Sequence, residues 1–120
     1  MFLIFEAIRT AKIPTGVQVA RDGEQAIRLF EEVEANAQAP CPALVILDIN
    51  LPRRSGGQVL EYMRKTRRCR NAKVIVVSTS DSPRDREEMS RLGANDYFRK
   101  PSEYDEFMKL GAVVKDLLAA

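Results

Sequence analysis

The sequence predicts an α/β domain whose parallel sheet is doubly wound, with helices on both faces. Two short segments, 43–47 and 74–77, are uniformly apolar, which is typical of strands that helices cover on both sides. Segments with the apolar spacing of amphipathic helices alternate with such strands along the chain, and the connections are short. The chain has 120 residues, which suits one domain built on one such sheet.

The composition excludes several kinds of chemistry. Hydrophobic residues make up 45% and charged residues 30%, an ordinary balance for a globular domain, and no apolar run is long enough to predict a membrane span. The absence of histidine excludes histidine general bases, Ser-His-Asp triads and histidine metal sites. Two cysteines, Cys41 and Cys69, are too few for a disulfide scaffold or a four-ligand zinc site, and we expect them to be free thiols in a reducing cytoplasm.

In chain order, the segment 17–20 is the first short strand and 22–33 the first amphipathic helix. After the apolar strand 43–47, the segment 55–66 has the same helical spacing of apolar residues. Both helices begin with the spacing of a capping box, in which the first side chain accepts a hydrogen bond from a backbone N–H three residues later. The two boxes are Asp22 with Gln25 and Ser55 with Gln58.

The second half of the chain repeats this alternation. After the apolar strand 74–77, Ser82 and the proline that follows it predict a helix start, and Gly93 predicts its end. The segment 96–99 is a last short strand. Ser102 marks the start of a long final helix, whose apolar stripe consists of Phe107, Leu110, Val114, Leu117 and Leu118.

Polar side chains follow three of the predicted strands at the point where each strand ends. These are Asp48, Ser78 and Lys100. The carboxyl ends of parallel strands meet at one edge of the sheet, where ligands bind in open α/β folds. We therefore expect a carboxylate, a hydroxyl and an ammonium group to converge there. Each of them alone also has an ordinary explanation, as a turn acid, a loop hydroxyl or a surface charge.

Three segments together resemble the response-regulator receiver domain. They are 44–56 (LVILDINLPRRSG), 74–78 (VIVVS) and 93–101 (GANDYFRKP), and their order and spacing also match that family. The resemblance runs from about Ile4 to the end of the chain, and it implies a single flavodoxin-like receiver domain over residues 1–120. The segment 48–52 and the long loop 34–42 are most similar to the small stand-alone receivers that partner phytochrome-like histidine kinases.

The resemblance implies a phosphoacceptor switch in a two-component phosphorelay rather than an ordinary enzyme. Asp48 would accept a phosphoryl group from a phosphohistidine of a cytoplasmic sensor histidine kinase. Lys100 would pair with the carboxylate and then with the phosphoryl oxygens, and Ser78 would donate its hydroxyl to one of these oxygens. Mg²⁺ would bridge Asp48 and the phosphoryl group, with the backbone carbonyl of Asn50 as a further ligand.

The resemblance also implies how the signal leaves the domain. As Ser78 moves toward the phosphate, Tyr97 would rotate inward, as the family's switch aromatic does. The surface formed by the helix 84–92, the strand 96–99 and the start of the last helix would then change shape and bind a downstream protein. The alternative for Tyr97 is half-buried packing on an edge strand.

One region departs from the family pattern, which begins with an apolar strand ending in two acidic, metal-binding residues. The segment 2–11 instead resembles the family's first helix, so the first strand and the acidic pair are missing. In the alternative, residues 2–5 form that strand and Glu6 is a substitute ligand. We favour the helix, because the strand would leave only about ten residues for a crossover that needs a dozen or more.

A missing first strand would leave unpaired backbone groups and apolar surface beside the strands 17–20 and 43–47. Three outcomes stay open: another chain covers the gap, these strands close up, or the chain is an N-terminally truncated form of a longer product. We expect weak Mg²⁺ binding, because the acidic pair is missing, and a homodimer or a strand-exchanged dimer.

A basic stretch between Arg53 and Lys73 contains one acid, Glu61. It has neither interleaved aromatic residues beyond Tyr62 nor a groove-reading motif, so we interpret it as a solvated helix face and loop and predict no nucleic-acid partner.

Two other functions are alternatives. The first is a receiver-shaped adaptor that binds partners without phosphorylation, because its metal site is incomplete. The second is a phosphatase of the haloacid-dehalogenase type, which also places a nucleophilic Asp after an apolar strand. That class needs a second Asp as general acid where this chain has Asn50, so the sequence favours a receiver over a phosphatase.

Overall fold

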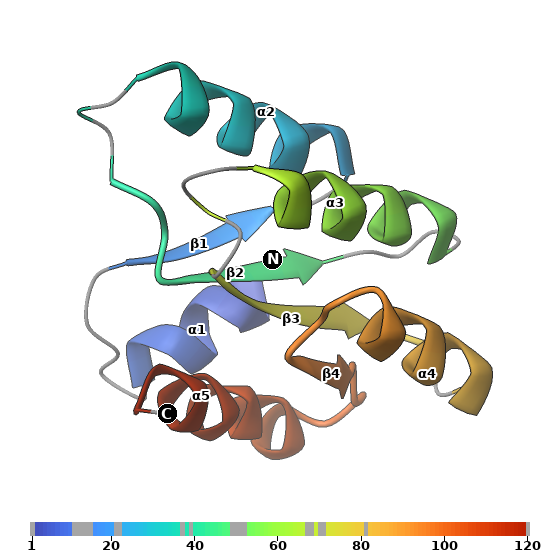
Figure 1. The fold of residues 1–120 in the computed structure, drawn as a ribbon. Helices are drawn as coiled ribbons and strands as arrows, with labels where there is room; N and C mark the ends of the chain where they lie inside the picture. The colour runs from blue at the N-terminus through green and yellow to red at the C-terminus, as the bar shows by residue number, and fades with distance from the viewer. Residues whose placement is uncertain are drawn as a thin grey trace.

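The computed structural model describes residues 2–10, 16–20, 23–36, 38, 40–48, 53–66, 69, 72–80 and 82–119. In this part of the chain, helices and strands alternate as predicted (Figure 1). The helices are α1 (Phe2–Thr10), α2 (Gly23–Ala35), α3 (Arg53–Lys65), α4 (Pro83–Arg91) and α5 (Tyr104–Ala119). The strands are β1 (Val17–Ala20), β2 (Leu44–Asp48), β3 (Lys73–Ser78) and β4 (Asp96–Arg99). Within the described ranges, no helix has the length and apolar character that a membrane span requires.

The four strands form one parallel sheet in the order β1-β2-β3-β4. α2, α3 and α4 contribute buried side chains to the core on one face of this sheet, and α1 and α5 to the core on the other face (Figure 1). The predicted doubly wound α/β fold is therefore confirmed.

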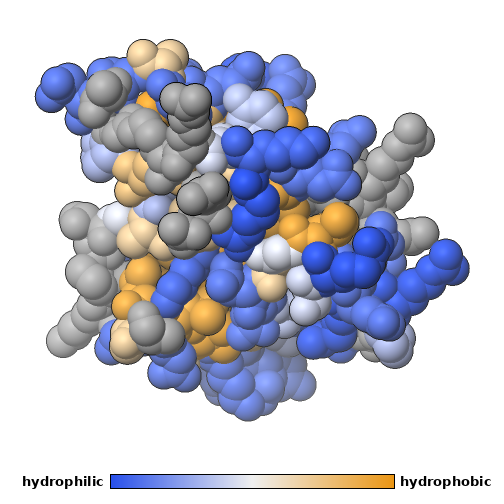
Figure 2. Space-filling model, in the orientation of Figure 1, coloured by the Kyte–Doolittle hydropathy of each residue, from blue (hydrophilic) through white to orange (hydrophobic). Residues whose placement is uncertain are grey.

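The alternation of side chains along the central strands divides the core in two. Val45 and Leu47 of β2 pack in the cluster with α2, α3 and α4, whereas Leu44 and Ile46 pack in the cluster with α1 and α5. Because both faces of β2 are buried, its sequence is apolar without interruption. Figure 2 shows hydrophilic side chains widely spread over one face of the molecule, with patches of hydrophobic ones among them.

The N-terminal segment is the helix α1, as we favoured, rather than a strand. Its buried residues Ile4 and Ala7 pack in one cluster with Ile46 of β2 and Leu110 of α5. β1 pairs directly with β2 along the whole of β1. Of the three outcomes that the sequence leaves open, the structure shows that the strands close up. This closure pairs backbone groups of β1 and β2 that would otherwise be left without partners.

Two helix starts differ from the prediction. α3 begins before the predicted cap Ser55, which therefore lies inside the helix. α5 begins at Tyr104, and the carbonyl of Glu103 accepts the first helical hydrogen bond, so Glu103 rather than Ser102 occupies the cap position. The predicted cap Asp22 lies outside the described residues.

The start and end of α4 agree with the prediction. Ser82 Oγ accepts a hydrogen bond from the Asp85 N–H at 3.4 Å, and Pro83 occupies the first turn. Gly93 follows the helix with a φ of 115°, a conformation that side chains rarely allow. A Cβ atom at this position would also lie 2.8 Å from Nε of Arg64, so a side chain here would strain the backbone and displace the Arg64 side chain.

Cys41 and Cys69 form a disulfide, so the prediction of free thiols is wrong. Cys41 precedes β2 and Cys69 precedes β3, and because these are neighbouring parallel strands, the segments that enter them lie side by side. The two Cα atoms are 5.6 Å apart, which is a usual distance for a disulfide. The cysteine count could not reveal this proximity, because the two residues are 28 positions apart in the sequence.

Candidate functional site

The three predicted site residues come together at the carboxyl edge of the sheet. Asp48 ends β2 and lies in register with Val77, the neighbour of Ser78 at the end of β3. Lys100 follows β4, and its backbone N–H donates to the Ser78 carbonyl at 2.7 Å. The parallel register therefore holds all three residues at one edge, because each stands at the end of its strand or directly after it.

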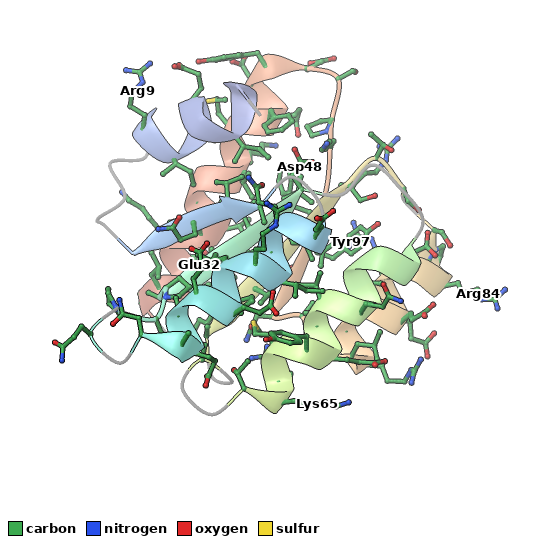
Figure 3. The ribbon with its side chains drawn as sticks, turned by 90° about the horizontal axis from the view of Figure 1, so that it is seen from above. Arg9, Glu32, Asp48, Lys65, Arg84 and Tyr97 are labelled. Atoms are coloured by element: carbon green, nitrogen blue, oxygen red, sulfur yellow. A yellow bond between two sulfur atoms is a disulfide. The ribbon has the colours of Figure 1, made fainter. Side chains whose placement is uncertain are left out.

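A buried ion pair joins two of these residues. Lys100 Nζ contacts Asp48 Oδ1, and the two side chains are only 16% and 6% exposed, respectively. Oδ1 is buried, and the Lys100 ammonium is the charged group that the described residues place against it. Burying a carboxylate is unfavourable unless a cation lies beside it, and Lys100 is that cation. Figure 3 shows Asp48 at the end of its strand. A carboxylate at this edge can attack an electrophilic phosphorus or bind a metal cation.

A chain of hydrogen bonds leads from Ser78 away from this carboxylate. Ser78 is buried, and its Oγ accepts a hydrogen bond from the Ser80 N–H at 3.2 Å. The Ser80 carbonyl accepts a hydrogen bond from the Tyr97 hydroxyl at 3.0 Å, and Ser80 Oγ donates to Asp85 Oδ2 at 2.7 Å. Ser80 thus connects the site edge to α4 and β4. We did not identify Ser80 from the sequence. The serines at positions 78, 80 and 82 could have pointed to it.

Tyr97 lies between this loop and α4. Its ring is half-buried and packs against the core cluster on the α2–α4 side of the sheet. The guanidinium of Arg86 stacks over the ring, 5.0 Å from its centroid, which adds a cation–π contact. Figure 3 labels Tyr97 near the carboxyl edge of the sheet. Tyr97 is therefore in contact with both the loop that follows Ser78 and the exposed side of α4.

The predicted metal ligands are only partly placed. Asn50 lies outside the described residues. Glu6 lies on α1, where Arg9 of the same helix donates to its Oε2 atom at 2.7 Å. Among the residues that the structure describes, no group of three or more His, Cys, Asp or Glu side chains could hold a metal ion. Asp48 Oδ1 fits Mg²⁺ as a buried, anionic oxygen ligand, but it is a single carboxylate.

One arginine of the basic stretch has a structural role. Arg64 donates to the carbonyl of Ala72 at 2.9 Å, to the carbonyl of Gly93, and to Oδ1 of Asn95 at 3.3 Å. Partial burial lowers the pKa of its guanidinium. The interpretation of a solvated helix face is therefore wrong for Arg64, which ties α3 to the loop that leads into β4.

Comparisons with known proteins place this architecture among signalling domains. The chain matches the family described as the response regulator receiver domain over residues 2–111. It is 27% identical over 108 residues to Response regulator Rcp1 of Synechocystis, covering 90% of this chain and 74% of that protein. It is 26% identical to a probable methanogenesis regulatory protein, FilR2, of Methanothrix harundinacea, covering 95% of this chain and 73% of the relative.

Solved structures give the same result. The phosphorylated cyanobacterial phytochrome response regulator RcpA superposes with a TM-score of 0.78 at 27% identity, covering 99% of this chain and 85% of that one. The Mn²⁺-bound form of Rcp1 has a TM-score of 0.74 at 25% identity, covering 96% and 83%. A response regulator of red light signalling in R. palustris has a TM-score of 0.74 at 29% identity, covering 94% and 81%.

Proposed function

Because this chain belongs to the response regulator receiver domain family, we propose that Asp48 is the residue that accepts the phosphoryl group. Members of this family are receiver domains of two-component systems, which work with histidine kinases and are signalling domains rather than conventional enzymes. One observation carries the proposal for Asp48. Its buried carboxylate stands at the end of β2 with the Lys100 ammonium against one oxygen.

The transfer is a displacement at phosphorus. A carboxylate oxygen of Asp48 attacks the phosphorus of a phosphohistidine on the kinase, the new O–P bond forms, and the P–N bond breaks. The imidazole nitrogen leaves with the electron pair of the broken bond. Because a carboxylate is a weak nucleophile, positioning and neutralisation of charge provide most of the acceleration.

Lys100 and Ser78 provide the positioning and part of the neutralisation. Lys100 holds Asp48 Oδ1 in the unphosphorylated site and then balances the charge of the phosphoryl oxygens. Ser78 donates its hydroxyl to one of those oxygens. The hydrogen bond from the Lys100 backbone to the Ser78 carbonyl keeps the two strand ends together during this exchange.

Mg²⁺ at this edge would neutralise the two anions that meet in the transfer. The similar receiver Rcp1 has been solved in a Mn²⁺-bound form, which supports a divalent cation at the site. Asp48 and the backbone carbonyl of Asn50 are the ligands that we propose. We propose weak binding, because Mg²⁺ favours carboxylates in its shell and the described residues hold no cluster of three or more His, Cys, Asp or Glu side chains that could bind it.

The output is a change at the α4–β4–α5 surface, which the hydrogen bonds of Ser80 support. When Ser78 turns toward a phosphoryl oxygen, its bond with the Ser80 N–H changes, and the Ser80 carbonyl moves relative to the Tyr97 hydroxyl. Tyr97 and Arg86 then rearrange on the exposed side of α4. A downstream protein would bind this surface, which also carries Tyr104, exposed to 50%. A cytoplasmic location and a sensor histidine kinase as donor complete the proposal.

The second candidate function is an adaptor that binds partners without phosphorylation. The observation that favours it is that no group of three or more His, Cys, Asp or Glu side chains among the described residues could hold a metal ion. The two functions differ in their response to a phosphodonor. An adaptor would bind its partner equally well before and after exposure to acetyl phosphate.

The test of the proposed function is incorporation of radiolabelled phosphate from acetyl phosphate with Mg²⁺, at increasing Mg²⁺ concentrations. We expect acid-stable, hydroxylamine-sensitive label in the wild-type chain and none in Asp48→Asn. The matched control is Asp96→Asn, which changes an exposed Asp at the opposite end of β4 and should label normally. Since the chain has no histidine, a phosphohistidine of the chain itself cannot contribute to the signal. Label retained by Asp48→Asn would exclude the proposed acceptor.

A further inference from the structure

The outer edge of β1 carries backbone groups that no described strand pairs. β1 is the first strand in the sheet order, and β2 is its one neighbour there. Leu44 N donates to the Gly16 carbonyl at 3.2 Å, and Val17 lies in register with Leu44. In a parallel ladder, successive residues point their N–H and C=O groups to opposite sides. The backbone groups of Val17 and Val19 therefore point away from β2, toward the open edge.

A groove of about 510 Å³ runs along this edge beneath α2. Its floor is the strand, at Gln18, Val19 and Ala20, and its wall is one face of the helix. Figure 3, a view from above, shows Glu32 on α2 near β1. The groove combines open backbone groups with a helix wall, which is the arrangement that accepts an added strand. The wall residues are Gln25, Arg28, Leu29 and Glu32.

We propose that this edge pairs with the same edge of a second copy of the chain, with the two β1 strands antiparallel about a two-fold axis. The charges on α2 favour a second copy over an unrelated strand. Arg28 is exposed and bonded to Glu24 at 2.9 Å, and Glu32 is exposed one turn beyond it. A two-fold axis makes the two α2 helices antiparallel, so Arg28 of one copy lies between its own Glu24 and Glu32 of the partner subunit. The charged face of α2 is therefore complementary to itself.

The size of the edge sets the strength of this contact. β1 has 4 residues and extends about 13 Å, and α2 has 13 residues and extends about 20 Å. Such a patch is smaller than the surface of a stable dimer, so the association is weak and rapidly exchanging. It extends the sheet to eight strands and leaves β4 and α4, at the opposite end of the sheet order, exposed in both copies. The dimer does not depend on phosphorylation of Asp48.

The test is sedimentation equilibrium of the full chain and its variants over a wide range of protein concentration. We expect a monomer–dimer equilibrium in the wild type that Arg28→Glu weakens by about tenfold or more, because it opposes like charges across the axis. Glu32→Arg should have a similar effect, and the double variant Arg28→Glu/Glu32→Arg should restore dimerisation. Lys109→Glu on α5 is the matched control, since Lys109 also pairs with an exposed Glu on its own helix, and it should dimerise normally.

A second variant tests the strand rather than the charges. Val19→Pro removes an N–H that faces the open edge, which an edge strand tolerates, so the monomer should keep its circular dichroism spectrum and lose the dimer. A wild-type chain that stays monomeric at every concentration would overturn the proposal. So would dimerisation that Arg28→Glu leaves intact and Lys109→Glu abolishes, because the interface would then lie on α5.

Discussion

Replacing Lys100 by alanine leaves the Asp48 carboxylate buried without its cation. Two unit charges about 4 Å apart attract each other by about 4 kcal/mol at an effective dielectric constant of 20. The site lies at the edge of the sheet, and the Lys100 side chain is 16% exposed, so water can enter where the ammonium was and recover part of this energy. We therefore expect Lys100→Ala to lower the free energy of unfolding by about 2 to 3 kcal/mol, below the full range for a completely buried pair.

Urea unfolding followed by circular dichroism measures this effect, and a double-mutant cycle isolates the pair. Asp48→Asn/Lys100→Ala should recover most of the loss, with a coupling energy of about 2 kcal/mol between the two side chains. Lys115→Ala, at an exposed position of α5, is the matched control and should change stability by less than about 0.5 kcal/mol. If Lys100→Ala is as stable as this control, or if the cycle shows no coupling, the reasoning about the buried pair is refuted.

Three further predictions use other parts of the structure. The double variant Cys41→Ser/Cys69→Ser should lose about 3 to 4 kcal/mol of stability, because the disulfide closes a loop across 28 positions, and reductant should reproduce the loss in urea unfolding of the wild type. Tyr97→Phe removes the hydrogen bond to Ser80 and should lower the free energy of unfolding by about 1 kcal/mol. It should leave phosphate incorporation unchanged but reduce the phosphorylation-dependent NMR shifts of α4. Undiminished shifts would exclude Tyr97 from the switch. In titrations monitored by tyrosine fluorescence, Mg²⁺ should bind at millimolar rather than micromolar concentrations, and Asp48→Asn should abolish that binding. Micromolar affinity would show that further carboxylates reach the site.

The central strands β2 and β3 and the polar residues at their ends could be predicted because burial determines the residue types of these strands directly. β1 and β4 have the predicted bounds, and β2 and β3 run on to include Asp48 and Ser78. A strand covered on both faces is apolar throughout, so its polar terminal residue is visible in the sequence. Once the strands are parallel, the convergence of Asp48, Ser78 and Lys100 follows from their positions alone.

The features that the sequence did not predict depend on contacts between distant positions. The disulfide between Cys41 and Cys69 and the bonds of Arg64 to the loop before β4 both depend on which loops become neighbours. The starts of α3 and α5 were predicted less well, because residues a few positions apart could each cap the helix. Local spacing does not distinguish well between such candidates. The direct pairing of β1 with β2 was one of three open outcomes. No local sequence pattern determines which partner the backbone groups of an unpaired strand edge will find.

Asp48 is the residue that we propose becomes the aspartyl phosphate. The most direct measurement is peptide mass spectrometry after phosphorylation by acetyl phosphate and borohydride reduction, which converts an aspartyl phosphate into homoserine. The expected result is homoserine at position 48 and at no other aspartate of the chain. An unmodified position 48, in a sample that carries phosphate elsewhere, would contradict it.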